Sequence, residues 1–245
     1  MMNRKLNEIN FKVFVDFDGT ISLTDIGEEL FVKFGNAEAA YEIIGRWLRG
    51  EIGSIQSWRE LCDSLGEFDI NGFNNFVDSL PIDPGFHDFI KYCTVNKIDV
   101  FVVSDGLDFY IKRFLEREKL EGLKVYSNRA IFTSENKIMP DFPYRDEECD
   151  TCANCKRNHV INNSHDDDFT IYIGDGNSDT CPAQYCDFIF AKNSLLKFCE
   201  KNRISFFPYK NFHDVVARME QLGEKKRLRK RHQAELKRRE VYMRG

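Results

Sequence analysis

The sequence lacks any apolar run that approaches the ~20 residues needed to cross a bilayer as a helix. Its first twelve residues, MMNRKLNEINFK, contain no apolar segment like that of a secretory signal peptide. Internal repeats are absent as well. We therefore expect a cytoplasmic globular protein without a membrane span. Its 245 residues are enough for one large domain, or for a core with a small accessory domain.

The small net charge of -5 conceals an uneven distribution along the chain. Residues 224–245 contain ten Lys and Arg against three Asp and Glu, a local charge of +7, which leaves -12 for the rest. This segment is most simply a solvated, partly frayed helix. It could also bind nucleic acid, an anionic membrane surface or an acidic partner. Because no Phe, Trp or Tyr lies among the charges of residues 225–240, nucleic-acid recognition would be non-specific at best, and we do not expect it.

Apolar strands alternate with helices along much of the chain, which predicts an α/β fold with a mainly parallel, doubly wound sheet. Residues 127–150 between them look irregular or hairpin-like. The main expected strands are 11–16, 98–103, 124–126, 169–173 and 188–191.

Residues 24–81 follow another pattern, with apolar residues three to four positions apart and glycines between the runs. That spacing is typical of amphipathic helices, so we expect a helical insert. The resulting division is a discontinuous core of residues 10–23 and 82–218, a helical cap of residues 24–81, and a basic helical tail of residues 219–245.

Three of the expected strands end in polar turns that contain glycine, namely DFDGT (16–20), SDG (104–106) and GDGNSD (174–179). Parallel strands place their carboxyl ends at one edge of a sheet, where ligands bind. Crowded carboxylates repel unless they share a cation or a proton, and hard oxygen ligands suit Mg²⁺. Ser104 and the amides after it offer contacts for a phosphate at a helix N-terminus, and Lys156 could complete a phosphate clamp.

The order of these motifs resembles the haloacid dehalogenase (HAD) superfamily of phosphohydrolases. The resemblance rests on DFDGT, VVSDG (102–106), Lys156 and GDGNSD, and it covers most of residues 11–192. It implies a Rossmann-like core with a parallel sheet and an inserted helical cap. A helical insert directly after the first motif is similar to the small cap of the phosphoserine-phosphatase-like branch.

The resemblance also implies a Mg²⁺-dependent phosphatase with an aspartyl-phosphate intermediate. Asp16 would be the nucleophile, and Asp18 would protonate the leaving oxygen and then activate water. Lys156 would neutralise the phosphoryl group and orient Asp16. The implied metal site consists of Asp16, Asp18 through its carbonyl, Asp175, and Asp179, which would support either the metal or Lys156.

A second implied set binds the substrate. Ser104 would hydrogen-bond the transferring phosphoryl group, and Asp25, nine residues after the nucleophile, could bind an amino or hydroxyl group. Plain structural alternatives stay open, because Ser104, Asp25 and Asp179 could each be a helix N-cap, and Lys192 is the rival of Lys156. The substrate-binding set is Ser104, Asp105, Gly106, Lys156 and Asp25.

A finer resemblance is to the phosphatases that act on the enol phosphate of methionine salvage. It is carried by VVSDGLDFYI (102–111), CDTCANCK (149–156), FAKNSL (190–195) and FFPYKNFHDV (206–215). Asp105 stands where those phosphatases usually have glycine. The implied substrate is a small phosphorylated metabolite. A phosphoserine, phosphocholine or phosphoethanolamine phosphatase, and a non-catalytic binding protein with the HAD fold, remain alternatives.

The eight cysteines are expected to be reduced thiols, since no signal peptide precedes them. Cys149, Cys152 and Cys155 have a C-x2-C-x2-C spacing that could hold Zn²⁺ with His159 as a fourth ligand. A second C-x2-C pair is missing, so a reduced cluster near the active site is the preferred interpretation. The sequence leaves open a monomer or a homodimer.

Overall fold

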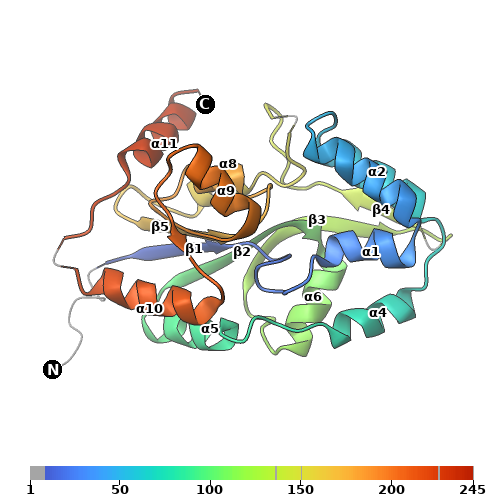
Figure 1. Ribbon diagram of the computed structural model, residues 1–245, viewed down its shortest axis with the longest axis horizontal. Coiled ribbons are helices and arrows are strands. Elements are labelled where there is room, and N and C mark those ends of the chain that lie inside the picture. The colour runs from blue at the N-terminus through green and yellow to red at the C-terminus, as the bar shows by residue number, and fades with distance from the viewer. Residues whose placement is uncertain (1–8, 136, 150, 226, 245) are drawn as a thin grey trace. The chain divides into compact units, whose positions relative to one another are not determined.

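The computed structural model describes residues 9–135, 137–149, 151–225 and 227–244 (Figure 1). Residues 1–8, which make up most of the segment behind the signal-peptide prediction, lie outside the described residues, as do positions 226 and 245 of the predicted tail. No helix within the described ranges is long and apolar enough to cross a membrane.

Seven strands form one sheet in the order β4-β3-β2-β1-β5-β6-β7. Strand β1 pairs in parallel with both β2 and β5, β5 with β6, and β6 with β7, whereas β3 and β4 pair antiparallel. The α/β fold with a mainly parallel sheet and flanking helices is thus confirmed. The strands are β1 (Phe11–Val15), β2 (Asp99–Leu107), β3 (Lys124–Phe132), β4 (Ile138–Asp141), β5 (Phe169–Gly174), β6 (Phe188–Ala191) and β7 (Phe207–Pro208).

The chain divides into two compact units, and the first comprises the described residues of 1–16, 82–102 and 156–245. Its strands are almost continuously apolar, as expected where both faces of a parallel sheet are covered. Phe86 and Phe89 of α5 each place a ring 4.9 Å from that of Phe212 on α10, which joins these helices side by side (Figure 1). The helices of this unit are α5 (Phe86–Val95), α7 (Lys156–Asn162), α8 (Thr180–Ala183), α9 (Asn193–Lys201), α10 (Phe212–Gly223) and α11 (His232–Arg244).

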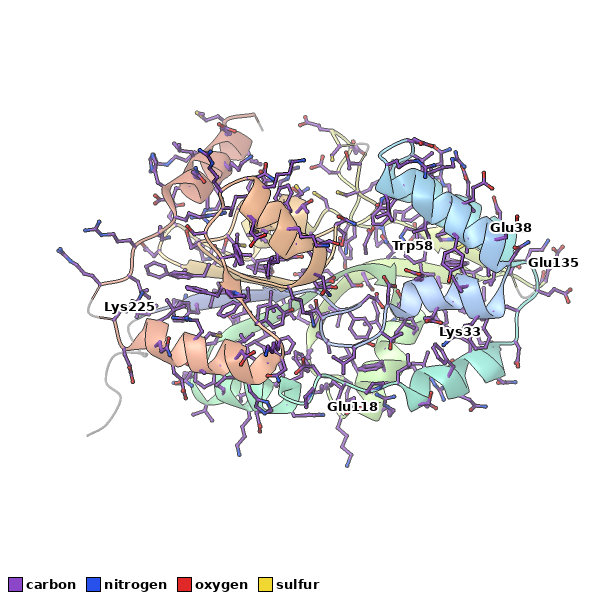
Figure 2. The ribbon with its side chains drawn as sticks, viewed as in Figure 1. Lys33, Glu38, Trp58, Glu118, Glu135 and Lys225 are labelled. Atoms are coloured by element: carbon purple, nitrogen blue, oxygen red, sulfur yellow. The ribbon has the colours of Figure 1, made fainter. Side chains whose placement is uncertain are left out.

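The second unit comprises residues 17–81 and 103–155, apart from the undescribed positions 136 and 150. The expected helical insert is present, since four of its helices lie within residues 24–81. Aromatic side chains fill it, and Trp58 (Figure 2) packs edge-on against Phe31 with ring centroids 5.6 Å apart. Its helices are α1 (Ile26–Phe34), α2 (Ala37–Leu48), α3 (Ser54–Leu65), α4 (Ile70–Ser79) and α6 (Asp108–Arg117).

Two local predictions need correction. The SDG stretch does not form a turn after its strand, because β2 continues through it to Leu107. The strand expected at 124–126 extends to Phe132 and pairs with β4, so the hairpin interpretation of the region after it is confirmed. In both places the strand pairs with a neighbouring strand, β2 with β3 and β3 with β4, and this pairing outweighs the local turn preference of polar residues and glycine.

The basic tail is not simply solvated. Helix α10 continues through position 219, where the tail was expected to begin, and α11 follows from His232. Lys230 and Arg231 before α11, and Arg238 within it, donate hydrogen bonds to the segment from Asp166 to Asp187. For these three residues the prediction of a solvated, partly frayed helix is therefore wrong.

Candidate active site

Asp16 and Lys156 form a buried ion pair at the carboxyl end of the central strand. The amide of Asp16 donates to the carbonyl of Ile173 at 2.9 Å, which continues the β1–β5 ladder by one residue. Lys156 is the first residue of α7, and its Nζ lies 2.6 Å from Oδ1 of Asp16. The side chains of Asp16 and Lys156 are 7% and 2% exposed, so this attraction acts in a medium of low polarity.

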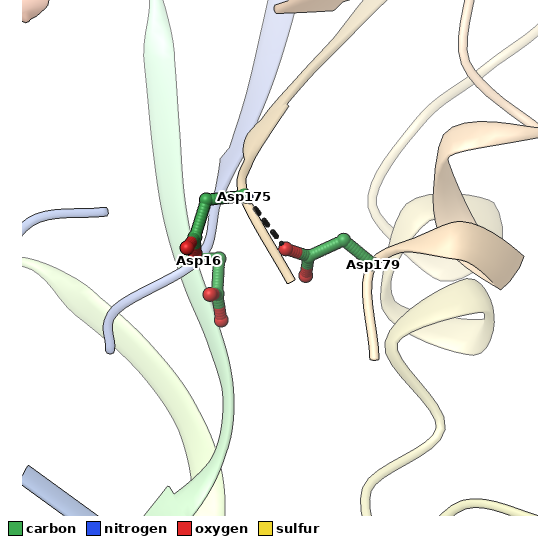
Figure 3. Close-up of side chains that lie close together, drawn as sticks. All are labelled: Asp16, Asp175 and Asp179. Carbon is green, nitrogen blue, oxygen red and sulfur yellow. Dashed lines mark hydrogen bonds between the residues drawn. The ribbon is translucent and has the colours of Figure 1, made fainter. Parts of the chain in front are cut away.

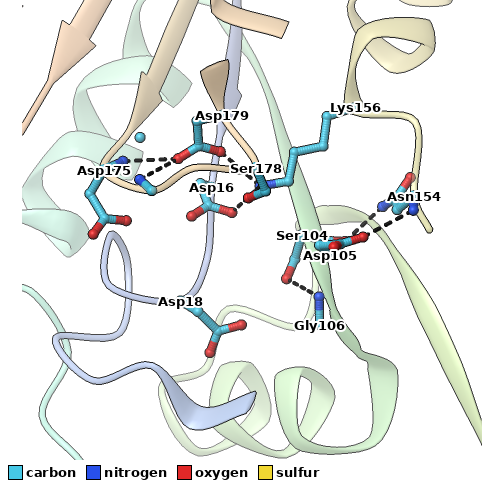
Figure 4. A network of polar contacts seen from close by, with 12 residues as sticks. Asp16, Asp18, Ser104, Asp105, Gly106, Asn154, Lys156, Asp175, Ser178 and Asp179 are labelled. Carbon is cyan, nitrogen blue, oxygen red and sulfur yellow. Dashed lines mark hydrogen bonds and ion pairs between the residues drawn. The ribbon is translucent and has the colours of Figure 1, made fainter. Parts of the chain in front are cut away.

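Asp179 fixes the lysine from its other side (Figure 4). Its Oδ1 accepts from Lys156 Nζ at 2.8 Å and from the Tyr172 hydroxyl at 2.7 Å. Its Oδ2 accepts from the amides of Asp175 and Gly176, both at 2.9 Å. Although Asp179 directly precedes α8, its side chain makes no capping hydrogen bond, so the N-cap alternative is not what holds it.

Three carboxylates of this unit gather in one place (Figure 3). Asp16, Asp175 and Asp179 each present an oxygen, and these oxygens lie within 4.8 Å of one another. It is the one group of three or more potential metal-ligating side chains within the part of the chain that the structure describes. Asp175 keeps some exposure to solvent and accepts from Asn193 Nδ2 at 3.1 Å through Oδ2.

The second unit holds Asp18 in a separate set of contacts. Its Oδ1 accepts from the amide of Ile26 at 2.8 Å, and its Oδ2 accepts from the Tyr110 hydroxyl at 3.1 Å. Gly106 leaves space for this pair, because a Cβ there would lie 2.0 Å from the Tyr110 oxygen and 2.8 Å from Oδ2 of Asp18. The glycine is thus required by close packing.

Asn154 ties the SDG stretch of β2 (104–106) to the chain just before Lys156 (Figure 4). Its side chain donates to the carbonyl of Ser104 at 2.7 Å, and its amide donates to Oδ1 of Asp105 at 3.0 Å. Asn128 donates to the Asp105 carbonyl at 2.6 Å. Ser104, which is 1% exposed, accepts the Gly106 amide through Oγ at 2.9 Å and is not the N-cap of α6.

A model of the family described as Putative Phosphatase matches residues 12–205. The chain belongs to this phosphatase family. It is 34% identical to the 2-hydroxy-3-keto-5-methylthiopentenyl-1-phosphate phosphatase of Bacillus mycoides (strain KBAB4), over 89% of this chain and 100% of that protein. The resemblance found in the sequence is thereby confirmed.

Solved structures share the fold of this Putative Phosphatase family member. A phospho-aspartyl intermediate analogue of phosphoserine phosphatase superposes with a TM-score of 0.67 at 19% identity, covering 86% of this chain and 99% of that one. A HAD-family hydrolase from Salmonella enterica serovar Typhi gives 0.68 at 16% identity, covering 85% and 70%. At these identities the match concerns the fold alone.

The charges around Asp16 in this phosphatase call for a cation. Burial raises the pKa of Asp16 well above its usual range, and Asp179 and Asp175 add to the rise, against the lowering effect of Lys156. Burial alone would lower the pKa of Lys156, but Asp16 and Asp179 outweigh it and raise that pKa above its ordinary value. One lysine thus faces three carboxylates, and a hard divalent cation fits the oxygen donors that remain.

The pKa of Asp18 is also raised, by a different set of neighbours. Burial raises its pKa to about 8, and the nearby charge of Asp25 adds to the rise, against the lowering by the Ile26 amide and the Tyr110 hydroxyl. A carboxyl group with such a pKa carries a proton at neutral pH. That is the state a general acid needs.

The other residues considered in the sequence, namely Asp25, Lys192 and the clustered cysteines, lie in different surroundings. Asp25 is the N-cap of α1, with Oδ1 accepting the Glu28 amide at 2.8 Å. Lys192, the rival lysine, lies instead over the ring of Tyr209. In the described part of the chain, the three clustered cysteines form no metal-ligating group with His159; Cys155 is buried and contacts Asp146, while residue 150 lies outside the described residues.

Sequence reasoning missed the residues that hold the predicted ones in place. Tyr172 is an ordinary apolar strand residue by pattern, and Tyr110 is an ordinary aromatic helix residue. Only their hydroxyls, each directed to a carboxylate, single them out. Asn154 and Ser178 lie inside quoted motifs, and Ser178 Oγ accepts from Lys156 at 2.9 Å. Their position in those motifs was the one available signal.

Proposed function

We propose that this chain is a phosphomonoesterase that hydrolyses a small phosphorylated metabolite through an aspartyl-phosphate on Asp16. The observation that carries the proposal is the buried contact of Asp16 with Lys156, which is itself held by Asp179. In phosphoryl transfer, positioning and charge neutralisation supply most of the rate acceleration. A carboxylate whose orientation is fixed by a buried ammonium group meets both requirements.

The proposed chemistry has two steps. An oxygen of Asp16 attacks phosphorus, the phosphorus–oxygen ester bond breaks, and Asp18 gives its proton to the leaving oxygen. Asp18 then removes a proton from a water molecule, whose oxygen attacks phosphorus. The bond between phosphorus and the Asp16 oxygen breaks, so that phosphate is released and the Asp16 carboxylate is regenerated. The raised pKa of Asp18 supports its role as the acid in the first step.

Mg²⁺ is the proposed cofactor, and when bound it would offset the negative charge of the phosphoryl group and of the carboxylates. Asp16 and Asp175 are its proposed side-chain ligands. Asp179 already accepts four hydrogen bonds, so we assign it to Lys156 rather than to the metal. The carbonyl of Asp18 remains a proposed ligand on the strength of the family resemblance.

Ser104 and Lys156 are the proposed contacts of the phosphoryl group, with residues 24–81 as the proposed cap over the core of residues 10–23 and 82–218. Asp105 and Gly106 would act by shaping the Ser104 stretch, since Asp105 accepts from Asn154 and Gly106 donates to Ser104. Asp25 caps α1 with one oxygen, so the structure gives no specific support to an amino-alcohol or amino-acid phosphate.

The proposed substrate is the enol phosphate named for the Bacillus mycoides relative, which aligns over its full length at 34% identity. A cytoplasmic site of action is part of the proposal, because Cys62, Cys93, Cys149, Cys186 and Cys199 are free thiols and such thiols persist in reducing compartments.

The proposal is tested by phosphate release from a panel of phosphorylated metabolites with and without Mg²⁺, beginning with p-nitrophenyl phosphate. We expect release that depends on Mg²⁺ and is fastest with the enol phosphate. Asp16→Asn should lower turnover on the order of 10³-fold or more while the circular dichroism spectrum is unchanged. Asp88→Asn is the matched control, because Asp88 is an exposed aspartate.

A protein that releases no phosphate with Mg²⁺ but binds RNA in a salt-sensitive way would support the non-catalytic alternative. Equal rates for Asp16→Asn and Asp88→Asn would exclude Asp16 as the nucleophile.

A further inference from the structure

Two arginines near the C-terminus hold the turn that follows α8. The Arg231 guanidinium donates to the carbonyls of Ala183 and Gln184 at 2.8 and 2.7 Å. Arg238 donates to the carbonyl of Tyr185 at 2.6 Å. The Arg231 amide and the Arg238 guanidinium both reach Oδ1 of Asp187 at 3.2 Å. We call Arg231, Arg238 and Asp187 the C-terminal clamp.

The clamp is a built contact rather than a chance surface pairing. The Asp187 side chain is fully buried and that of Arg238 is 12% exposed. Oδ2 of Asp187 accepts from the amide and hydroxyl of Thr170, both at 3.0 Å. Its Oδ1 accepts from the two arginines. Buried charges persist in proteins where they are paired and hydrogen-bonded, as Arg238 and Asp187 are here.

The same short segment carries Asp179 at its other end. Helix α8 begins directly after Asp179, and the amide of Ala183 donates to the Asp179 carbonyl at 3.1 Å. Arg231 donates to two carbonyls at the opposite end of this helix, and the Ala183 carbonyl also accepts the amide of Cys186 at 3.3 Å. Residues 179–187 are thus fixed at one end by Lys156 and at the other by the clamp.

Strand β5 also links the Asp179 end of residues 179–187 to their Asp187 end. Thr170 at its beginning contacts both Asp187 and Arg238, and Tyr172, two residues later, donates to Asp179. Lys230 adds hydrogen bonds to the carbonyls of Asp166 and Asp168 just before the strand. The C-terminal segment therefore contacts both chain segments that lead to the Asp179 carboxylate.

We propose that Arg231 and Arg238 are positioning residues for the phosphoryl-transfer site, acting through residues 179–187 on Asp179 and hence on Lys156. The inference builds on the proposed function, because its catalytic readout is phosphate release. The basic C-terminal segment lies beyond residues 12–205 of the family match. The inference gives this segment a role in positioning the site of its own chain.

The test compares Arg231→Met and Arg238→Met with Arg239→Met. The methionine variants remove the guanidinium group and keep an unbranched side chain. Arg239 is a matched control because it is an exposed arginine of α11, directly after Arg238. Arg238→Lys keeps a positive charge beside Asp187 but loses the planar fork, and it decides the question if a methionine variant fails to fold.

Two readouts are taken at a temperature where circular dichroism shows every variant folded. The first is hydrogen exchange at the amides of Asp175 and Gly176, which donate to Asp179. We expect roughly tenfold faster exchange in the clamp variants than in Arg239→Met. The second is turnover, which should fall roughly tenfold at unchanged KM, with an intermediate loss in Arg238→Lys.

A lower melting temperature with exchange and turnover equal to those of Arg239→Met would overturn the proposal and reduce the clamp to a stabilising contact. The two proposals fail separately. If the wild-type protein releases no phosphate from any ester, the proposed function is lost, while exchange at Asp175 and Gly176 still decides whether the clamp holds Asp179 in place.

Discussion

Nζ of Lys156 lies 2.6 Å from Oδ1 of Asp16, and both side chains are almost completely buried. The lysine is the main cation that offsets the crowded carboxylates around it, and Asp179 fixes it from the other side. Removing one member of a buried pair leaves an uncompensated charge, which costs far more than losing a surface contact.

Lys156→Met should therefore affect both stability and catalysis. We expect a loss of about 3–5 kcal/mol in the free energy of unfolding. Turnover should fall by about 10²–10³-fold. Lys192→Met is the matched control, since that lysine lies over the ring of Tyr209. Urea denaturation and phosphate release measure the two effects. Similar losses in both variants would show that the lysine of the site has been misassigned.

The dependence of turnover on pH should follow Asp18. With a pKa of about 8, this carboxyl is protonated below that pH, so kcat/KM should decline as the pH rises through about 8. Asp25→Asn removes a negative neighbour and should move this alkaline limb to lower pH, while asparagine still caps α1. Tyr110→Phe removes a hydrogen bond that lowers the pKa and should move the limb to higher pH.

Shifts of both variants in the same direction would contradict this electrostatic account, because the two substitutions change the pKa of Asp18 with opposite signs. The pH profiles of wild-type protein and both variants, measured on one substrate, provide the comparison.

Mg²⁺ should raise the melting temperature of the wild-type protein, since a ligand that binds only the folded state stabilises it. At a concentration of 100 times Kd the gain is about 2.7 kcal/mol. Asp175→Asn should lose most of this response. Without Mg²⁺ the variant should be no less stable than wild type, because Asp175 raises the pKa of Asp16 as a repelling neighbour.

Thermal melts with and without Mg²⁺ are sufficient for this measurement. An undiminished response in Asp175→Asn would remove Asp175 from the proposed metal ligands.

Gly174→Ala should disturb Asp179 directly. A Cβ at this position would lie 2.4 Å from Oδ2 of Asp179, which is held by two amides and cannot move aside freely. We expect a destabilisation of roughly 1–3 kcal/mol together with reduced turnover. Gly122→Ala is the control, because a Cβ there meets no atom within 4 Å. Equal stability and turnover in both variants would contradict the packing argument.

The amino-acid sequence by itself determined the chemistry and the order of the main elements. Apolar strands, helical spacing and the three polar motifs are local features, so they could predict the α/β fold, the helical insert and the candidate residues Asp16, Lys156 and Asp175. The family match confirms the class of protein to which these motifs belong.

Tertiary structure decided which partner each polar group takes. The four hydrogen bonds of Asp179, the link from Asn154 to the Ser104 stretch, and the contact of Arg238 with Asp187 join residues 3 to 51 positions apart. Local patterns carry no information about most such pairings, because they depend on which segments the sheet brings together. For this reason the tail looked like a solvated charge run in the sequence, whereas the folded chain buries part of it.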